Sequence, residues 1–331
     1  PTGSALIWDY QAPWWLPGGN AQTIYSAKVA KRYTGQKPNW LRERWDTPDG
    51  DFVDVDWRTD DEDQLDESPL LVLFHGLEGS SSSHYAQAFA KETQARGWRM
   101  AVPHFRGCSG EINWAPRAYH SGDFEEIGWM LDRFRLQHQG PIFAVGISLG
   151  GNALMRWGGE MGMDAQQYVN AIASVSSPID LAASGHAIDT GFNKTVYARM
   201  FLATMKPRAM QKLQQYPGLF DPEELAAAKT LYAFDNVFTA PLHGFRNTND
   251  YWDRASAKPG LSRMQVPALV LNAQNDPFVP ASCLPTADQV SDYVTLWQPE
   301  EGGHVGFASG AFPADLQEMP WAVLEWMTQH G

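Results

Sequence analysis

The stretch "VGISLGGNA" at residues 145–153 decides the fold of this chain. It places Ser148 between Gly146 and Gly150, in the pattern Gly-x-Ser-x-Gly. The apolar segment "PIFAVGI" (141–147) leads into the serine, and "LGGNALMRW" (149–157), which has a helical composition, follows it. The sequence therefore predicts a buried strand, a sharp turn at Ser148 and then a helix.

Such a turn has chemical consequences for the serine at its apex. Small neighbours let the chain turn tightly, which forces the serine into a strained backbone conformation and exposes its hydroxyl above the sheet. The N-terminus of the following helix stabilises negative charge at the same place. A Gly-rich turn can also be no more than a turn. The hypothesis that Ser148 is a nucleophile therefore requires a base and an acid elsewhere in the chain.

Segments typical of strands and of helices alternate over most of the chain. Alternating residues in "FVDVDW" (52–57) predict a half-exposed strand. Further strands are predicted at 69–76, 98–104, 170–178, 266–276 and 293–299, and helices at 84–96, 122–138 and 321–327. Alternation of this kind predicts an α/β fold, with a mostly parallel central sheet that is covered by helices on both faces.

Two segments lie outside this alternation. Residues 1–40 are rich in aromatic residues, proline and glycine, and we expect an ordered but irregular arm in which Trp14, Trp15 and Tyr25 are buried. The acidic run "DDEDQLDE" (60–67) predicts a solvated loop between strands.

Residues 179–263 are helical in composition and lack a strand pattern. We interpret them as a helical cap inserted over the edge of the sheet, which divides the α/β core into residues 41–178 and 264–331. Most apolar residues of the cap are expected to pack on the body, and a few to line an acyl pocket. The candidates at helical spacing are Val196, Tyr197, Met200, Phe201 and Met205.

A nucleophilic serine needs a general base and an acid that orients the base. On a sheet with this turn, the chain order is serine, acid, histidine. Asp276 follows the predicted strand 266–276, and His304 lies in "EEGGHVGF" (300–307) after the last predicted strand. Asp180 is the alternative acid, but a long insertion follows it, so we assign the acid to Asp276.

Four other histidines compete with His304 for the role of base: His75, His104, His120 and His243. His304 alone follows the last predicted strand and has glycines beside it, which allow a loop to return over the sheet. We expect structural roles for His104 and His243.

Two backbone N–H groups are needed to bind the oxyanion that forms when an ester is attacked. We assign them to Leu149, directly after the serine, and to Leu77, which follows "FHG" (74–76). The loop "HGLEGSSSS" (75–83) could instead cradle a phosphate. However, it lacks the P-loop pattern, and no Gly-x-Gly-x-x-Gly occurs elsewhere. No metal-binding motif is present either, so we predict neither a cofactor nor a metal.

Bulk properties exclude several classes of partner. A net charge of −13 argues against binding to nucleic acid or to anionic membranes. No apolar run is long enough to span a bilayer, and no signal peptide is visible after Pro1. Two cysteines, Cys108 and Cys283, are typical of a reducing compartment, so we expect a cytoplasmic protein. The sequence leaves the oligomeric state open.

With these residues placed, the chain resembles the α/β-hydrolases, and among them the YheT-like bacterial hydrolases with their ABHD1- and ABHD3-type relatives. The motifs that carry this resemblance are "NAQTIY", "PDGDFVDVDW", "FHGLEGSSSSHY", "FRGCSGEIN", "YHSGDFEE", "GISLGGN", "FDNVFTAPLHGF", "NDPFVP" and "GGHVGF". The resemblance implies an esterase or acyltransferase that acts on short- to medium-chain acyl esters through Ser148, Asp276 and His304. It leaves the roles of 106–111 and 120–123 open.

Three functional hypotheses follow. The first is a serine carboxylesterase that hydrolyses an acyl-enzyme. The second hypothesis is an acyltransferase that forms the same acyl-enzyme and transfers the acyl group to an alcohol. A further alternative is a lipid hydrolase that takes a phospholipid or a monoacylglycerol as its substrate. The third is a non-catalytic lipid-binding protein, but such a protein usually lacks one of the three residues that are present here.

Overall fold

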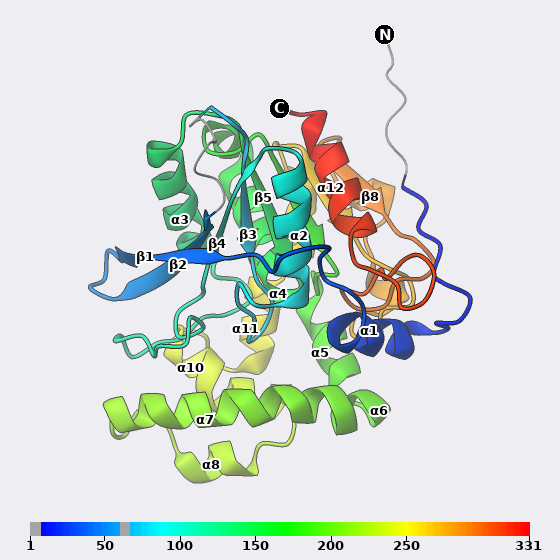
Figure 1. Cartoon of the computed structure of the whole chain (residues 1–331). Coiled ribbons are helices and arrows are strands. Elements are labelled where there is room, and N and C mark those ends of the chain that lie inside the picture. Colours follow the sequence, from blue (N-terminus) through cyan, green and yellow to red (C-terminus); the bar gives the residue numbers. More distant parts are fainter. Residues whose placement is uncertain (1–7, 60–66) are drawn as a thin grey trace.

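A central sheet of eight strands organises the computed structural model, which describes residues 8–59 and 67–331 (Figure 1). The predicted acidic loop at 60–67 lies outside these residues, except for Glu67. The strand order is β1-β2-β4-β3-β5-β6-β7-β8, and β2 runs antiparallel to both of its neighbours while the other pairs are parallel. The strands are β1 (Trp40–Asp46), β2 (Phe52–Arg58), β3 (Leu70–Phe74), β4 (Arg99–Pro103), β5 (Ile142–Ile147), β6 (Ala171–Val175), β7 (Ala268–Leu271) and β8 (Val294–Trp297).

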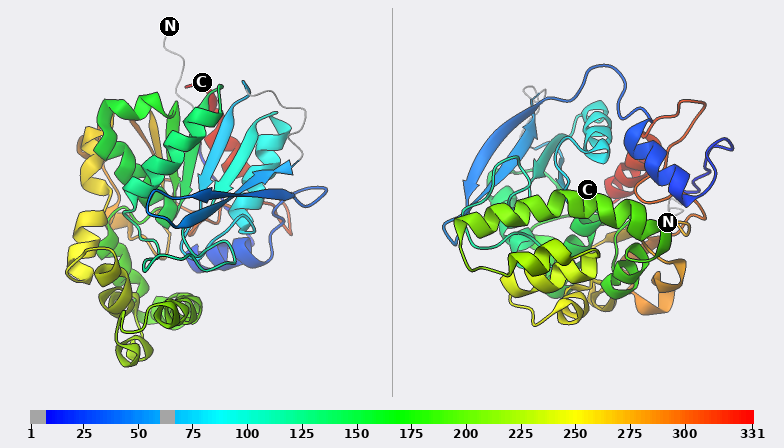
Figure 2. Two further views of the ribbon diagram at one scale, coloured as in Figure 1. Left: turned by 90° about the vertical axis from the view of Figure 1, so that its left-hand side faces the viewer. Right: turned by 90° about the horizontal axis from the view of Figure 1, so that it is seen from below.

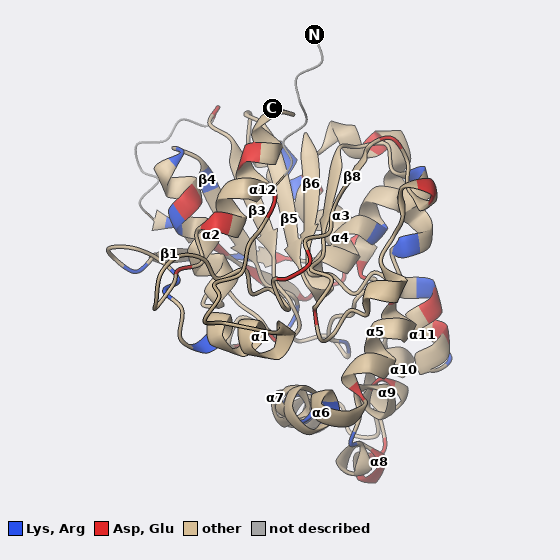
Figure 3. Ribbon diagram, turned by 90° about the vertical axis from the view of Figure 1, so that its right-hand side faces the viewer, with Lys and Arg blue, Asp and Glu red and all other residues tan. Residues whose placement is uncertain are grey.

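Helices cover both faces of this sheet. Leu71 and Leu73 of β3 belong to one apolar cluster with α2 (His84–Ala95) and α12 (Glu318–Thr328). Leu70 and Val72 belong to a second cluster with α3 (Phe124–Gln137) and α4 (Leu149–Met161). Because successive side chains of a strand point to opposite faces, a strand buried on both faces is apolar throughout. Strands β3, β5 and β6, whose residues are all buried, accordingly carry no charge (Figure 3). The predicted mostly parallel α/β sheet is confirmed.

The prediction that 52–57 is half-exposed is wrong. Asp54 and Asp56 of β2 are buried, because the unpredicted neighbouring strand β1 places arginines directly opposite them. Arg42 Nε lies 2.9 Å from Asp56 Oδ1, and Arg44 Nε lies 2.9 Å from Asp54 Oδ1. Apolar and acidic residues do alternate along β2, but the acidic side chains are buried and not exposed to solvent.

The N-terminal arm contains a helix that we did not predict, α1 (Gly19–Lys28). Its buried residues are polar, so the segment lacks the hydrophobic periodicity from which a helix could be predicted. The expected burial of Trp14 is also wrong, because this side chain is 91% exposed. Trp15 and Tyr25 are half-buried against each other, with ring centroids 5.2 Å apart.

A helical segment separates β6 from β7 and lies below the C-terminal ends of the strands (Figures 1 and 2). We call its helices the cap, and the limits 179–263 proposed for it remain a proposal. The cap consists of α5 (Leu181–Ile188), α6 (Gly191–Asn193), the π-helix η3 (Lys194–Ala198), α7 (Arg199–Gln215), α8 (Pro222–Ala227), α9 (Leu231–Phe234), the π-helix η4 (Asp235–Thr239), α10 (Ala240–Leu242) and α11 (Thr248–Ala255).

The apolar residues singled out on α7 and η3 divide into three groups. Phe201 and Met205 line a cavity below the sheet. Tyr197 is buried against Phe278 of the body, with ring centroids 4.4 Å apart, and the half-buried Val196 packs against the same cluster. Met200 is 47% exposed, so helical spacing alone did not identify its environment.

Candidate active site

Ser148 lies at the tip of the turn between β5 and α4. Its backbone has φ 52° and ψ −117°, and its amide donates to the carbonyl of Val175 at 2.9 Å. The flanking glycines are required sterically. A Cβ on Gly146 would lie 2.4 Å from the Cα of Gly151, and one on Gly150 would lie 2.4 Å from the carbonyl oxygen of Phe74. The strained serine is therefore held by a turn that larger residues could not form.

Three predicted site residues form one chain of hydrogen bonds. Ser148 Oγ lies 3.0 Å from His304 Nε2, and His304 Nδ1 lies 2.9 Å from Asp276 Oδ2. The Asp276 side chain is fully buried, and its other oxygen accepts from the amide of Phe278 at 2.8 Å. A carboxylate at Nδ1 keeps the proton of a neutral imidazole there and leaves Nε2 free to accept the serine proton.

The alternative acid, Asp180, is engaged elsewhere. It caps α5, and its Oδ1 accepts from the amide of Ala183 at 3.2 Å. Of the two aspartates that follow strands, Asp276 is the one that contacts the candidate base.

The competing histidines are tied to backbone groups. His75 is fully buried and accepts from the amide of Phe105 at 2.9 Å, and its burial lowers its pKa to about 3. His104 is bonded to the carbonyl of Asp54, and His243 accepts from the amide of Ala118. These contacts give His104 and His243 the structural roles that we expected.

His120 lies on the wall of the cavity, next to the ring of His243, with centroids 4.9 Å apart. Its Nδ1 accepts from the amide of Gly122 at 3.2 Å, a bond within its own loop. Of the described histidines, only His304 is hydrogen-bonded to Ser148.

The two expected oxyanion donors belong to segments that adjoin the serine. Leu149 is the first residue of α4, so its amide has no partner inside the helix. A Cβ on Gly76 would lie 3.3 Å from Ser148 Cβ, which places the 75–77 turn against the nucleophile. None of the hydrogen bonds among the described residues uses the amide of Leu77. Both N–H groups are thus available near Ser148.

Sequence reasoning missed the contribution of the arm to this site. The amide of His304 donates to Thr23 Oγ1 on α1 at 2.8 Å. Gln22 Oε1 accepts from the amide of Gly302 and from Asn275 Nδ2, each at 2.9 Å. Helix α1 therefore fixes the loop that carries the candidate base His304 and also the residue before the candidate acid Asp276.

A signal for this contact was present in the sequence. The motif "NAQTIY" (20–25) puts polar residues into an otherwise aromatic arm, and two of them, Gln22 and Thr23, are buried. Buried polar side chains are normally hydrogen-bonded, so their burial points to partners elsewhere in the chain.

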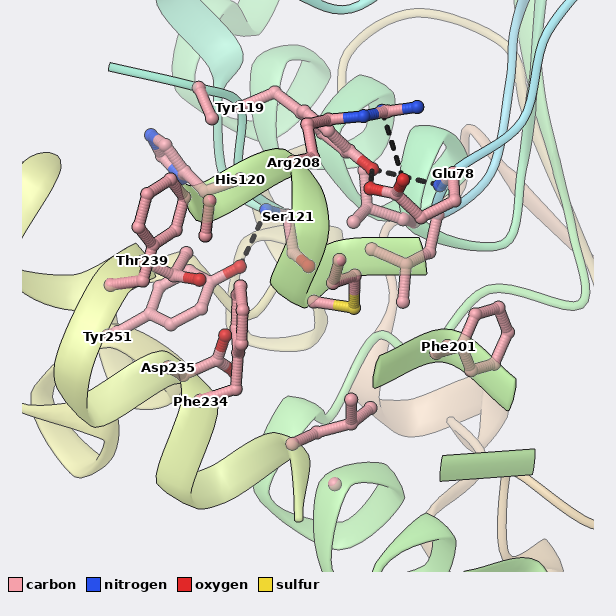
Figure 4. Close-up of a pocket in the computed structure, with 18 of the residues that line it drawn as sticks. Glu78, Tyr119, His120, Ser121, Phe201, Arg208, Phe234, Asp235, Thr239 and Tyr251 are labelled. Carbon is pink, nitrogen blue, oxygen red and sulfur yellow. Dashed lines mark hydrogen bonds and ion pairs between the residues drawn. The ribbon is translucent and has the colours of Figure 1, made fainter. Parts of the chain in front are cut away.

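A cavity with about 1160 Å³ of empty space, open solvent included, lies between the sheet and the cap (Figure 4). Ser148, Leu149 and His304 lie on its wall. Its apolar lining comes mainly from the cap: Leu181, Ile188, Phe201, Met205, Leu231, Phe234 and Phe238. Asp235 of η4 also lines it, and burial raises the pKa of this carboxyl to about 7.

The segments 106–111 and 120–123 brace the walls of the cavity. Arg106 is buried and pairs with Asp51 at 3.2 Å and with Glu126 at 3.1 Å. Asn152 of α4 donates to the carbonyl of Ser121 at 2.7 Å and ties this loop to the serine-bearing helix. These contacts are structural, and none of them touches Ser148.

The described ranges, 8–59 and 67–331, contain neither a candidate metal cluster nor a helix that could cross a membrane. No three His, Cys, Asp or Glu side chains there are grouped so as to hold a metal ion. Within the same ranges, no helix combines the length and the apolar composition that a bilayer crossing requires. Cys108 and Cys283 are both buried and free.

Comparison with known proteins adds to this geometry. Residues 69–311 match the family described as the alpha/beta hydrolase fold. The Escherichia coli (strain K12) protein named "Putative esterase YheT" is 37% identical over 306 residues, which cover 92% of this chain and 88% of that protein. Human "Phospholipase ABHD3" is 26% identical over 327 residues, covering 96% of this chain and 78% of the relative.

Among solved structures, Est1E from Butyrivibrio proteoclasticus with ferulic acid bound has a TM-score of 0.54 at 15% identity. The superposition covers 88% of this chain and 98% of Est1E. At this level of identity the likeness concerns the fold alone.

Proposed function

The chain belongs to the α/β-hydrolase family, and we infer that this hydrolase is a serine carboxylesterase for short- to medium-chain acyl esters. One observation carries the proposal. The hydroxyl of Ser148, the imidazole of His304 and the buried carboxylate of Asp276 are joined at hydrogen-bond distances on the wall of a largely apolar cavity.

In the proposed mechanism, Ser148 Oγ attacks the ester carbonyl carbon while His304 Nε2 takes the hydroxyl proton. Asp276 stabilises the imidazolium that forms. The amides of Leu77 and Leu149 donate to the oxyanion of the tetrahedral intermediate. His304 then gives its proton to the departing alkoxide, which leaves as the alcohol. Water, activated by the same imidazole, hydrolyses the acyl-enzyme.

The acyl chain has room under the cap. Phe201, Met205 and Phe238 present apolar surface to the cavity, and burial of each CH₂ group is worth about 0.8 kcal/mol. A panel of p-nitrophenyl esters of increasing chain length is expected to show kcat/KM rising and then falling, as the chain first fills and then exceeds this space.

The principal test is the variant Ser148→Ala. Turnover of p-nitrophenyl butyrate is expected to fall by about 10⁴-fold or more, with an unchanged circular dichroism spectrum. Ser82→Ala, at an exposed serine outside the cavity, is the matched control and should retain full activity. Near-wild-type turnover by the Ser148 variant would remove the basis of the proposal.

Transfer of the acyl group to an alcohol is the alternative outcome of the same acyl-enzyme. Product analysis in the presence of ethanol separates the two reactions, since hydrolysis alone yields only free acid. Assays with medium-chain phospholipids and monoacylglycerols test the lipid-hydrolase alternative that the relative named "Phospholipase ABHD3" suggests.

A further inference from the structure

Glu78 follows directly after the proposed oxyanion donor Leu77 and has an uncommon conformation. Its φ is 58°, a value that non-glycine residues rarely adopt. The hydroxyl of Tyr119 accepts from the amide of Glu78 at 2.8 Å and donates to its Oε1 at 2.6 Å (Figure 4). One phenol therefore holds both the main chain and the side chain of Glu78.

The second carboxylate oxygen of Glu78 is paired with the cap. Arg208 Nη1, from α7, lies 3.0 Å from Glu78 Oε2, and the same nitrogen donates to Cys108 Sγ at 3.2 Å. Glu78 and Arg208 both line the cavity, beside Ser148 and Leu149. A cap helix is thus joined by charge to the residue after an oxyanion donor.

Burial makes the ion pair between Glu78 and Arg208 costly to break. The side chain of Glu78 is only 9% exposed, Tyr119 and Cys108 are buried, and a buried carboxylate without its partner is costly. Burial raises the pKa of Tyr119 well above its ordinary value, and the nearby Cys108 and Glu78 add to the shift. Tyr119 therefore remains a phenol that can donate to Glu78.

The two ends of the 76–78 turn are held by different parts of the molecule. On the body side, the amide of Gly76 donates to the hydroxyl of Tyr85 on α2 at 2.9 Å. At the other end, Glu78 is held by Tyr119 of the body and, through charge, by Arg208 of the cap. The direction of the Leu77 amide depends on both anchors, because it lies between them.

We propose that Glu78 and Arg208 are positioning residues, and that their ion pair links the placement of cap helix α7 to the direction of the Leu77 amide. The oxyanion hole is then fully formed only when the cap is seated on the body. This inference rests on the proposed esterase function. It means that the cap affects the rate of the reaction as well as the choice of substrate.

Two other roles for Arg208 predict different kinetics. If Arg208 instead binds the substrate directly, its loss raises KM, and it does so for some esters more than for others. If the pair only stabilises the fold, its loss lowers the melting temperature and leaves kcat of the folded enzyme unchanged. A positioning role lowers kcat on every ester, because each reaction passes through the same oxyanion.

The test compares Arg208→Gln, Arg208→Lys, Glu78→Gln and the double variant Arg208→Gln/Glu78→Gln on p-nitrophenyl acetate and butyrate. Arg208→Gln is expected to lower kcat by roughly 10- to 100-fold on both esters, somewhat less than complete removal of an oxyanion donor. KM should change by less than about threefold. Arg208→Lys should recover part of the loss, and the double variant should be no slower than the slower single variant.

A second measurement isolates the oxyanion. An alkyl trifluoromethyl ketone adds to the serine and places an oxyanion in the hole, whereas the matching non-fluorinated ketone mainly reports ground-state binding. Affinity for the fluorinated ketone should fall with kcat/KM in Arg208→Gln and in Glu78→Gln, and affinity for the other ketone should stay unchanged. Arg199→Gln, at an exposed arginine of the same helix outside the cavity, is the matched control.

Unchanged kcat, a rise in KM alone, or unchanged affinity for the fluorinated ketone in well-folded Arg208→Gln or Glu78→Gln would overturn the proposal. Failure of the esterase function is distinguishable, because wild-type protein would then neither turn over esters through Ser148 nor bind the fluorinated ketone.

Discussion

The body of the molecule and its cap contribute to the cavity in different ways. The body holds the reactive groups with short bonds from rigid elements: Ser148 by its own turn, Asp276 by the amide of Phe278, and His304 by Thr23 of the arm. The cap contributes mostly apolar side chains, and its own cluster around Leu202, Met205 and Phe234 is small.

This contrast suggests a division of labour. Catalytic groups require positions accurate to a fraction of an ångström, and a sheet buried on both faces with hydrogen-bonded loops provides them. A small cluster of helices adapts more easily to different chains, and regions with few buried apolar contacts open first. We therefore expect substitutions in the body to alter chemistry, and substitutions in the cap to alter substrate range, local stability or seating on the body.

After Ser148 itself, the largest effect in the body is expected at the acid. Asp276→Asn should lower kcat by roughly 10³- to 10⁴-fold, because an amide at this position no longer favours the productive tautomer of His304 or stabilises its charged form. Steady-state kinetics on p-nitrophenyl butyrate measure the loss. Asp180→Asn is the matched control, since Asp180 also follows a strand but caps α5. Equal losses in both variants would contradict the assignment of the acid.

A smaller effect is expected where the arm meets the body. Thr23→Val keeps the shape of the side chain but removes the oxygen that accepts from the amide of His304. The loop that carries the base should loosen, and kcat should fall about 10-fold with little change in KM.

Thr195→Val is the control for this substitution. Thr23 donates to the carbonyl of Gly19, four residues earlier, and Thr195 likewise donates to that of Gly191, but Thr195 lies exposed in the cap. If Thr23→Val retained wild-type kcat, the arm would not position the base.

The smallest effect on activity is expected at Asp235 of the cap, which instead makes stability depend on pH. Burial raises its pKa from 3.8 to about 7, and Asp189 adds to the shift by repulsion. Between about pH 4 and 7 the folded protein keeps this proton while the unfolded chain releases it, so the contribution of Asp235 to stability falls as pH rises through that window.

The variant Asp235→Asn does not titrate there. Relative to wild type, it should gain about 2 kcal/mol of unfolding free energy between pH 5 and pH 8, as measured by urea unfolding. Asn can still accept from Trp252 Nε1, which donates to Asp235 at 3.2 Å. A stability difference that does not vary with pH would show that Asp235 is ionised in the folded protein throughout.

Local sequence patterns predicted much of this architecture. The strand, the small residues and the helix around Ser148 are consecutive in the chain, and Asp276 and His304 each follow a recognisable strand. Contacts between distant segments were not predictable in this way. Thr23 meets His304 across 281 residues, and the polar motif that contains Thr23 does not identify the residue that it contacts.

The two wrong environments have the same kind of cause. The sequence pattern predicts that Asp54 and Asp56 are solvated, because the polar and charged residues of β1 do not identify it as the strand that covers them. The sequence predicts that Trp14 is buried because tryptophan usually is, yet nothing in its own segment specifies which residues would cover it. In both cases the missing information was the identity of the neighbour.

The central claim is that Ser148 forms a covalent adduct at its hydroxyl. The most direct test is to treat the folded protein with a fluorophosphonate, digest it and locate the adduct by mass spectrometry. One adduct per chain is expected on the peptide that contains Ser148, with parallel loss of esterase activity. The variant His304→Ala should be labelled much more slowly. The variant Ser148→Ala should carry no label on that peptide. Ester turnover that persists after Ser148 is fully modified, or inactivation with the adduct on another residue, would contradict the account.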